Sequence, residues 1–192
     1  VFLGDALLRI SGASCRMAAV IVTARLLGAQ RFGQLGVVLK SVEFLATVGA
    51  LSLPPAVARY LAYLQVADRA RIRRVAVLAT VASFVSASLL AAAMLAGAVP
   101  FAQRVIGNPQ LASPLRLAAA LVMFRILEEL AKGMLAGYRK FKYIGLIDAL
   151  ASFLMVPLVV VSVARWGTVG AVAAAAFTSL LSLIACAAPA LR

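Results

Sequence analysis

The sequence predicts an all-α protein, a polytopic transmembrane bundle of six helices. Three observations carry this prediction. Apolar residues make up 65% of the 192 residues, against ~45–50% in soluble domains, and the mean hydropathy is +1.06. The stretches 75–103 and 166–191 contain no charged residue, and each exceeds the ~20 residues that cross a bilayer. Four further apolar stretches of similar length alternate with short polar links.

The expected spans cover residues 5–27, 32–57, 75–99, 113–135, 143–164 and 167–191. The third and the sixth are uncharged, and the fifth holds only Asp148. The first, second and fourth each contain several charged residues, so by hydropathy alone they also fit amphipathic helices at the membrane surface. Their length and the short turns between them favour spans that face a protein interior or a wet cavity.

The links between the spans contain residues that end helices. Residues 28–31 are expected to close the first span. Pro54 and Pro55 are expected to close the second, because a proline lacks the N–H that a helix interior requires. Gly133 and Gly137 form a small-xxx-small pair that lets two helices approach closely. A chance pairing in a chain rich in glycine and alanine explains this pair equally well.

Basic residues outnumber acidic ones by 19 to 6, which gives a formal net charge of +13. Nine of them lie in the links 59–74 and 138–142 and at Arg192, and five lie deep inside the spans. The other five lie in the remaining links or at the span ends beside them, namely Arg25, Arg31, Arg104, Arg116 and Arg165. Because cytoplasmic loops collect Lys and Arg, the two richer links and both ends of the chain are expected on the cytoplasmic side. The basic residues follow the sidedness of loops, so no nucleic-acid partner is expected.

The residue types exclude several chemistries. The absence of histidine removes His-based metal sites and Ser-His-Asp triads. Cys15 and Cys186 lie far apart without metal-ligand spacing and are expected to be small packing residues. No Gly-Lys-Ser/Thr loop for nucleotide phosphates is present. We therefore expect no enzymatic activity, no metal and no bound cofactor.

Charged residues inside the first two spans are candidates for function. A charge at mid-bilayer costs ~2.5–3.5 kcal/mol on insertion scales, so each needs a partner or water. Arg9 lies four residues after Asp5, at helical spacing, whereas Arg16 has no acidic neighbour at such spacing. Lys40 and Glu43 lie three residues apart in the second span. Arg16 is therefore the strongest candidate for binding an anionic ligand.

The fourth and fifth spans contain a second group of charges. Arg125, Glu128, Glu129 and Lys132 form a ladder of i+3 and i+4 neighbours, and Asp148 stands alone near the start of the fifth span. Such ladders often only hold a bundle together. Arginine, however, binds phosphate bidentately and stays charged. A cavity with several Arg and Lys would suit a lipid-linked phosphate or pyrophosphate.

Four motifs follow one another along the chain: TARLLGA at 23–29 leading into RFGQLG at 31–36, PAVARYL at 55–61, GMLAGYRKF at 133–141 and GTVGA at 167–171. In order and spacing they resemble polysaccharide and oligosaccharide flippases of the multidrug/oligosaccharidyl-lipid/polysaccharide exporter superfamily. The resemblance covers nearly the whole chain. It implies two pseudo-symmetric lobes around a central cavity, with residues 1–192 as the N-terminal lobe and a C-terminal lobe as its partner.

The resemblance also implies a function. Members move undecaprenyl-pyrophosphate-linked oligosaccharide across the bacterial inner membrane by alternating access, for surface polysaccharide such as O-antigen. Four basic residues, Arg9, Arg16, Lys40 and Arg125, are then expected to hold the pyrophosphate. Three acids are expected to couple transport to H⁺ or Na⁺, namely Glu43, Glu128 and Asp148.

Other functions stay open. A multidrug cation antiporter of the same superfamily would need an acidic and aromatic site, which the balance of five basic and five acidic intramembrane residues disfavours. A non-transporting membrane scaffold subunit would use the charge ladders for structure alone. A polyprenyl-phosphate transferase would want a clustered acidic motif, which only Glu128 and Glu129 approach.

Overall fold

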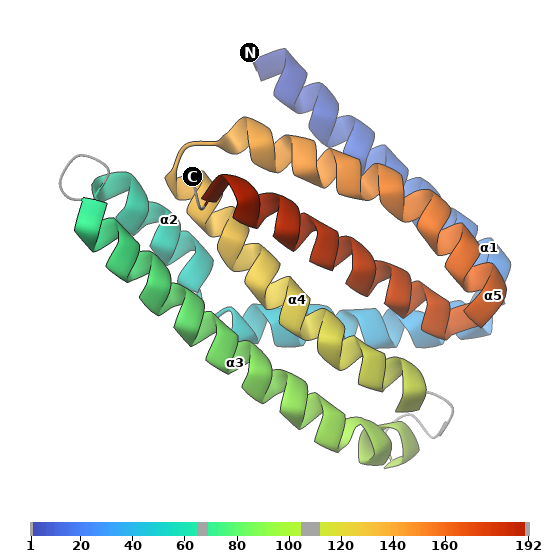
Figure 1. The fold of residues 1–192 in the computed structure, drawn as a ribbon. Helices are drawn as coiled ribbons and strands as arrows, with labels where there is room; N and C mark the ends of the chain where they lie inside the picture. Colours follow the sequence, from blue (N-terminus) through green and yellow to red (C-terminus); the bar gives the residue numbers. More distant parts are fainter. Residues whose placement is uncertain (1, 65–68, 105–111, 191–192) are drawn as a thin grey trace.

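The computed structural model of the chain describes residues 2–64, 69–104 and 112–190, with the side chains of 12–63, 71–98 and 113–187. This part of the chain is all α-helical (Figure 1). The helices are α1 (Phe2–Gly49), α2 (Leu53–Leu64), α3 (Arg69–Arg104), α4 (Ala112–Gly137) and α5 (Phe141–Ala190). The all-α prediction is confirmed, and the prediction of six separate helices is wrong, since five are found.

The two longest helices, α1 and α5, each reverse direction at one glycine (Figure 1). Gly28 has φ 73° and ψ 165°, and Gly167 has φ 58° and ψ −131°. Residues with a Cβ rarely adopt such conformations. The expected first and second spans are thus the two arms of α1, and the expected fifth and sixth are the two arms of α5. Because the helix resumes directly after each glycine, the structure has one long kinked helix where the sequence predicted two spans joined by a link.

The end of the expected second span forms a helix of its own. α1 ends at Gly49, and Leu51 and Ser52 turn the chain with φ values of 49° and 56°. Pro54 and Pro55 then lie in the first turn of α2, where a missing N–H costs no hydrogen bond. The expected span 32–57 is therefore too long, and most of the expected basic link 59–74 is helical.

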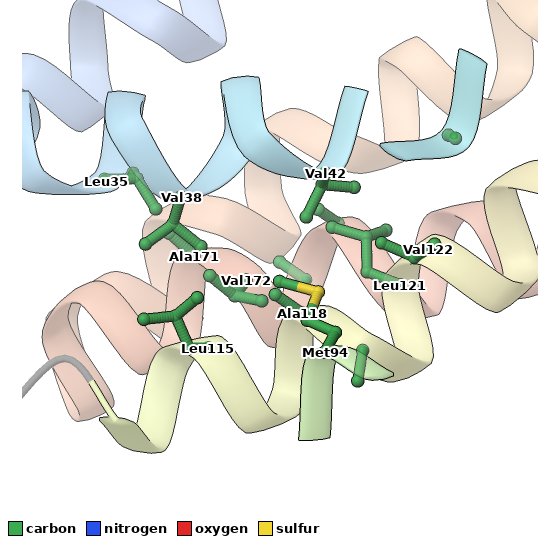
Figure 2. Packing of buried hydrophobic residues seen from close by; sticks show 14 of the residues in the cluster. Leu35, Val38, Val42, Met94, Leu115, Ala118, Leu121, Val122, Ala171 and Val172 are labelled. Carbon is green, nitrogen blue, oxygen red and sulfur yellow. The ribbon is translucent and has the colours of Figure 1, made fainter. Parts of the chain in front are cut away.

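The largest cluster of buried apolar residues lies between α1, α3, α4 and α5, and both arms of α5 contribute to it. Figure 2 shows Val42 of α1 opposite Leu121 and Val122 of α4. The same cluster includes Leu35, Val38, Met94, Leu115, Ala118, Ala171 and Val172. Since lipid is as apolar as leucine, close packing stabilises such a core within a bilayer more than the exclusion of water does.

α2 packs closely on the end of α4 through two glycines. A Cβ built on Gly133 would lie 2.6 Å from the carbonyl oxygen of Pro54, and one built on Gly137 would lie 2.7 Å from the Cβ of Leu61. The backbones can approach this closely only without side chains at these positions. The interpretation of Gly133 and Gly137 as a close-approach pair is confirmed.

Three helical segments are long and apolar enough to cross a membrane: Gly12–Gly49, Arg71–Ala98 and Phe141–Ala187. Large apolar side chains are exposed along them, among them Leu78, Leu89 and Leu150. α4 carries more charge, and it is the central helix, packed by α1, α2, α3 and α5. The chain is a multi-pass membrane protein by its apolar helices.

Candidate functional site

Three of the four predicted phosphate-binding cations lie near the middle of a helical arm. Arg16 is 14 residues after the start of α1 and 12 before the kink at Gly28. Lys40 is 12 residues after that kink and 9 before the end of α1. Arg125 is 13 residues after the start of α4 and 12 before its end. At ~1.5 Å per residue these positions lie ~13–21 Å from the helix ends. All three therefore lie well inside the helices that carry them.

Arg16 extends from α1 and is exposed. Its Nε donates a hydrogen bond of 3.4 Å to the carbonyl oxygen of Gly12, one turn earlier. Gly12 itself lies against Ala149 and Ser152 of α5. Among the described side chains Arg16 forms no ion pair, so most of its donors remain available. The side chain of Arg9 lies outside the described residues.

Lys40 and Glu43 form an ion pair on the second arm of α1, with Lys40 Nζ 2.7 Å from Glu43 Oε2. Both side chains are exposed, Lys40 to 79% and Glu43 to 67%. Val38 and Val42 on the same arm are buried in the core. The pair therefore faces away from the core of this bundle.

A second charge cluster joins α4 to α5 and is named here the α4–α5 cluster: Arg125, Glu128, Lys132 and Asp148. Lys132 Nζ lies 2.8 Å from Glu128 Oε1 and 2.9 Å from Asp148 Oδ1, and Arg125 Nη1 lies 3.7 Å from Glu128 Oε2. The Glu128 side chain is 4% exposed and that of Lys132 is 18% exposed. The cluster alternates in sign, so its four charges cancel within the bundle.

The turn between α4 and α5 explains why Lys132 meets Asp148. Arg139 has φ 57°, and the N–H of Lys140 donates to the carbonyl of Leu135 at 3.1 Å, which closes α4 and returns the chain as α5. Lys132 and Asp148 each lie eight residues from Lys140. In two antiparallel helices, equal distance from the turn places residues at equal height.

Two side chains of the α4–α5 cluster, Glu128 and Arg125, are incompletely partnered. Glu128 Oε2 is buried and has no hydrogen-bond partner among the described groups. Arg125 is about half exposed and makes only the long contact with Glu128 among the described ion pairs.

The sequence-predicted site residues are brought together only in part. Arg125, Glu128 and Asp148 meet through Lys132, a residue of the expected ladder that was not among the expected site residues. Glu43 pairs with Lys40 on the second arm of α1. Glu129 is exposed and forms no ion pair within the described part of the chain. The symmetric spacing of Lys132 and Asp148 about the turn was the signal that could have predicted their contact.

The arrangement offers exposed cations in the middle of helices and one buried carboxylate oxygen. Such cations can bind anionic oxygens, arginine as a bidentate fork and lysine as a point charge. Groups of three or more His, Cys, Asp or Glu that could hold a metal ion are not found in the described part of the chain. The exposed cations can bind anions, and the buried carboxylate can take up a proton or a cation.

Comparison with known proteins gives one match. The family model described as "Polysaccharide biosynthesis protein" matches residues 7–191, nearly the whole chain. No curated protein and no solved structure matches the chain significantly.

Proposed function

Because the chain belongs to the polysaccharide biosynthesis protein family, a transporter-type membrane family that is generally not enzymatic, we propose that it forms one lobe of a flippase. The flippase moves an undecaprenyl-pyrophosphate-linked oligosaccharide across the bacterial inner membrane for surface polysaccharide. Transport proceeds by alternating access, and the substrate is not chemically changed. The other lobe is the C-terminal part of the same transporter.

The observation that supports the proposal is the exposure of mid-helix cations. Arg16, Lys40 and Arg125 lie well inside their helices, and all three side chains are exposed on this bundle. Facing lipid, each charge would cost ~2.5–3.5 kcal/mol on insertion scales. A water-filled cavity or an opposing protein surface removes most of that cost. A pyrophosphate entering such a cavity meets donors that are already charged and oriented.

Arg125 is the residue best suited to hold the pyrophosphate. Its only ion-pair contact among the described residues is 3.7 Å long, so its remaining N–H groups are free to bind oxygen in the bidentate geometry. Lys40 lies on the neighbouring arm of α1 and adds a point charge, in competition with its contact to Glu43. Arg16 and Arg9, on the first arm of α1, also bind the pyrophosphate in this proposal.

Coupling to H⁺ or Na⁺ is assigned to Glu128, with Asp148 and Glu43. Glu128 Oε2 is buried without a hydrogen-bond partner among the described groups, a costly state that a proton or a bound cation relieves. When phosphate draws Arg125 away from Glu128, that oxygen loses its nearest positive charge. Cation uptake at Glu128 is then favoured, which links substrate binding to the ion gradient.

The test is a flipping assay with the full-length transporter in proteoliposomes. A fluorescent undecaprenyl-pyrophosphate oligosaccharide is loaded, and the fraction accessible to an external quencher is followed in time. Hydrogen bonds to charged groups contribute ~1.5–3 kcal/mol, so Arg125→Gln should slow flipping ~10- to 100-fold. Lys40→Gln should slow it as well.

The matched control is Arg116→Gln, because Arg116 is an exposed arginine near the start of the same helix. It should flip substrate at the rate of the unmodified protein. Unchanged flipping in both Arg125→Gln and Lys40→Gln, at equal protein level, would refute the assignment of the pyrophosphate to these residues.

A further inference from the structure

A hollow of about 620 Å³ opens beside the first turns of α3. Its lining residues are Arg73, Arg74, Val77 and Leu78. None of these belongs to the α4–α5 cluster or to the pair on α1. The hollow therefore combines two basic side chains with an apolar wall at a place the proposed transport mechanism does not use.

The two arginines of the hollow are free to bind an anion. Arg73 and Arg74 are both exposed, and neither forms an ion pair or a hydrogen bond with another described side chain. Adjacent residues on a helix point about 100° apart, so the two side chains border the hollow, whose wall is almost entirely apolar, from different directions. Arginine forks match the oxygens of a phosphate.

The apolar wall of the hollow continues along the outer face of α3. Val77 and Leu78 are exposed, and Val81 and Val85 follow them with 56% and 60% exposure. The opposite side of the helix is buried, at Ala79, Ser83 and Ala87 among others. The hollow thus opens onto a face that meets lipid, away from the packed side of the bundle.

The depth of the hollow matches the region between headgroups and acyl chains. Arg74 directly precedes the uncharged stretch 75–103, so it marks the membrane boundary. Half of the hydrocarbon core is ~15 Å, or ~10 residues of helix, which places the bilayer centre near Phe84. Arg73 and Arg74 then lie at the level of lipid phosphates, and Val77 to Val81 at the level of the first acyl carbons.

We propose that this hollow binds an anionic phospholipid of the surrounding bilayer. The phosphate rests between Arg73 and Arg74, and one acyl chain follows Val77, Leu78 and Val81. Two unpaired cations at one site favour a lipid with a net negative charge over a zwitterionic one. By the positive-inside rule this end of α3 faces the cytoplasmic leaflet. The proposal is independent of the transported substrate.

The test uses the full chain in zwitterionic detergent, titrated with phosphatidylglycerol or phosphatidylcholine, with bound lipid counted by native mass spectrometry. Phosphatidylglycerol should bind more tightly than phosphatidylcholine. The double variant Arg73→Gln/Arg74→Gln should weaken phosphatidylglycerol binding about 30-fold, which corresponds to ~1 kcal/mol per arginine. The matched control Arg25→Gln/Arg116→Gln removes two exposed arginines elsewhere and should change affinity less than twofold.

A second double variant, Arg73→Lys/Arg74→Lys, keeps both charges and thus keeps the test decisive if the glutamine variant fails to fold. It should weaken phosphatidylglycerol binding severalfold, because lysine lacks the fork. Three results would overturn the proposal: equal binding of the two lipids, unchanged affinity in the variants, or displacement of phosphatidylglycerol by equimolar undecaprenyl pyrophosphate. The last would assign the hollow to the lipid-linked pyrophosphate instead.

Discussion

Replacement of Lys132 tests whether the α4–α5 cluster holds the two helices together. Lys132 Nζ contacts Glu128 at 2.8 Å and Asp148 at 2.9 Å. At an effective dielectric constant near ~20, each contact represents ~6 kcal/mol of gross Coulomb attraction. Desolvation of the charges offsets most of this, because each ion loses several kcal/mol of hydration on burial. The intact cluster therefore contributes little net free energy to folding. Removing one of its charges, in contrast, lowers the free energy of unfolding substantially.

Lys132→Met keeps the length of the side chain and removes its charge. It leaves Glu128, which is 4% exposed, with only the 3.7 Å contact to Arg125. Removing one partner of a buried pair costs ~3–5 kcal/mol, so the free energy of unfolding should fall by about that amount. Titration of the full chain with sodium dodecyl sulfate in mixed micelles, followed by far-UV circular dichroism, measures it.

Two further variants make this measurement decisive. Lys132→Met/Glu128→Gln removes the stranded charge as well. The decrease in its free energy of unfolding should be smaller than that of Lys132→Met by ~2 kcal/mol or more. Lys40→Met breaks an equally short ion pair, 2.7 Å long, whose partners are exposed, and it should cost less than ~1 kcal/mol. Equal losses for Lys132→Met and Lys40→Met would refute the reasoning, because burial would then not matter.

The remaining predictions concern the backbone and helix contacts, each read from the same titration. Gly133→Ala places a Cβ 2.6 Å from a carbonyl oxygen of α2 and should cost ~1–3 kcal/mol by overpacking, whereas the control Gly33→Ala, with open space around it, should be neutral or stabilising. Gly28→Ala, with φ at 73°, should cost ~1–3 kcal/mol in backbone strain; an unchanged stability would show that α1 does not need this conformation. Ser86→Ala removes the 2.9 Å hydrogen bond to the carbonyl of Gly49 and should cost ~1 kcal/mol.

Apolar length and local spacing could be predicted from the sequence, because both depend on neighbours along one helix. The uncharged stretch 75–103 lies wholly within α3. The ladder on α4 pairs Glu128 with Arg125 and Lys132, at i+3 and i+4 as expected. Gly133 lies at a close helix contact, also as expected.

Helix number and contacts between helices were harder to predict. Gly28 and Gly167 reverse the chain within helices that continue on both sides, and no rule about polar links distinguishes such a reversal from a loop. Asp148 looked isolated because its partner Lys132 lies on another helix. Most of these helices carry apolar side chains around their whole circumference. The hydrophobic periodicity of the sequence therefore does not identify which face of a helix packs against its neighbours.

Burial separates the charges that stabilise this bundle from those that act beyond it. Glu128 and Lys132 are compensated inside the bundle at distances below 3 Å, so their loss should appear first as lost stability. Arg16 is exposed in the first arm of α1 without an ion pair among the described side chains, so no described acid of the bundle compensates its charge. Its replacement should leave the unfolding free energy nearly unchanged and lower flipping. The two measurements thus distinguish Lys132 from Arg16, and a charge that affects neither has no role in the proposed mechanism.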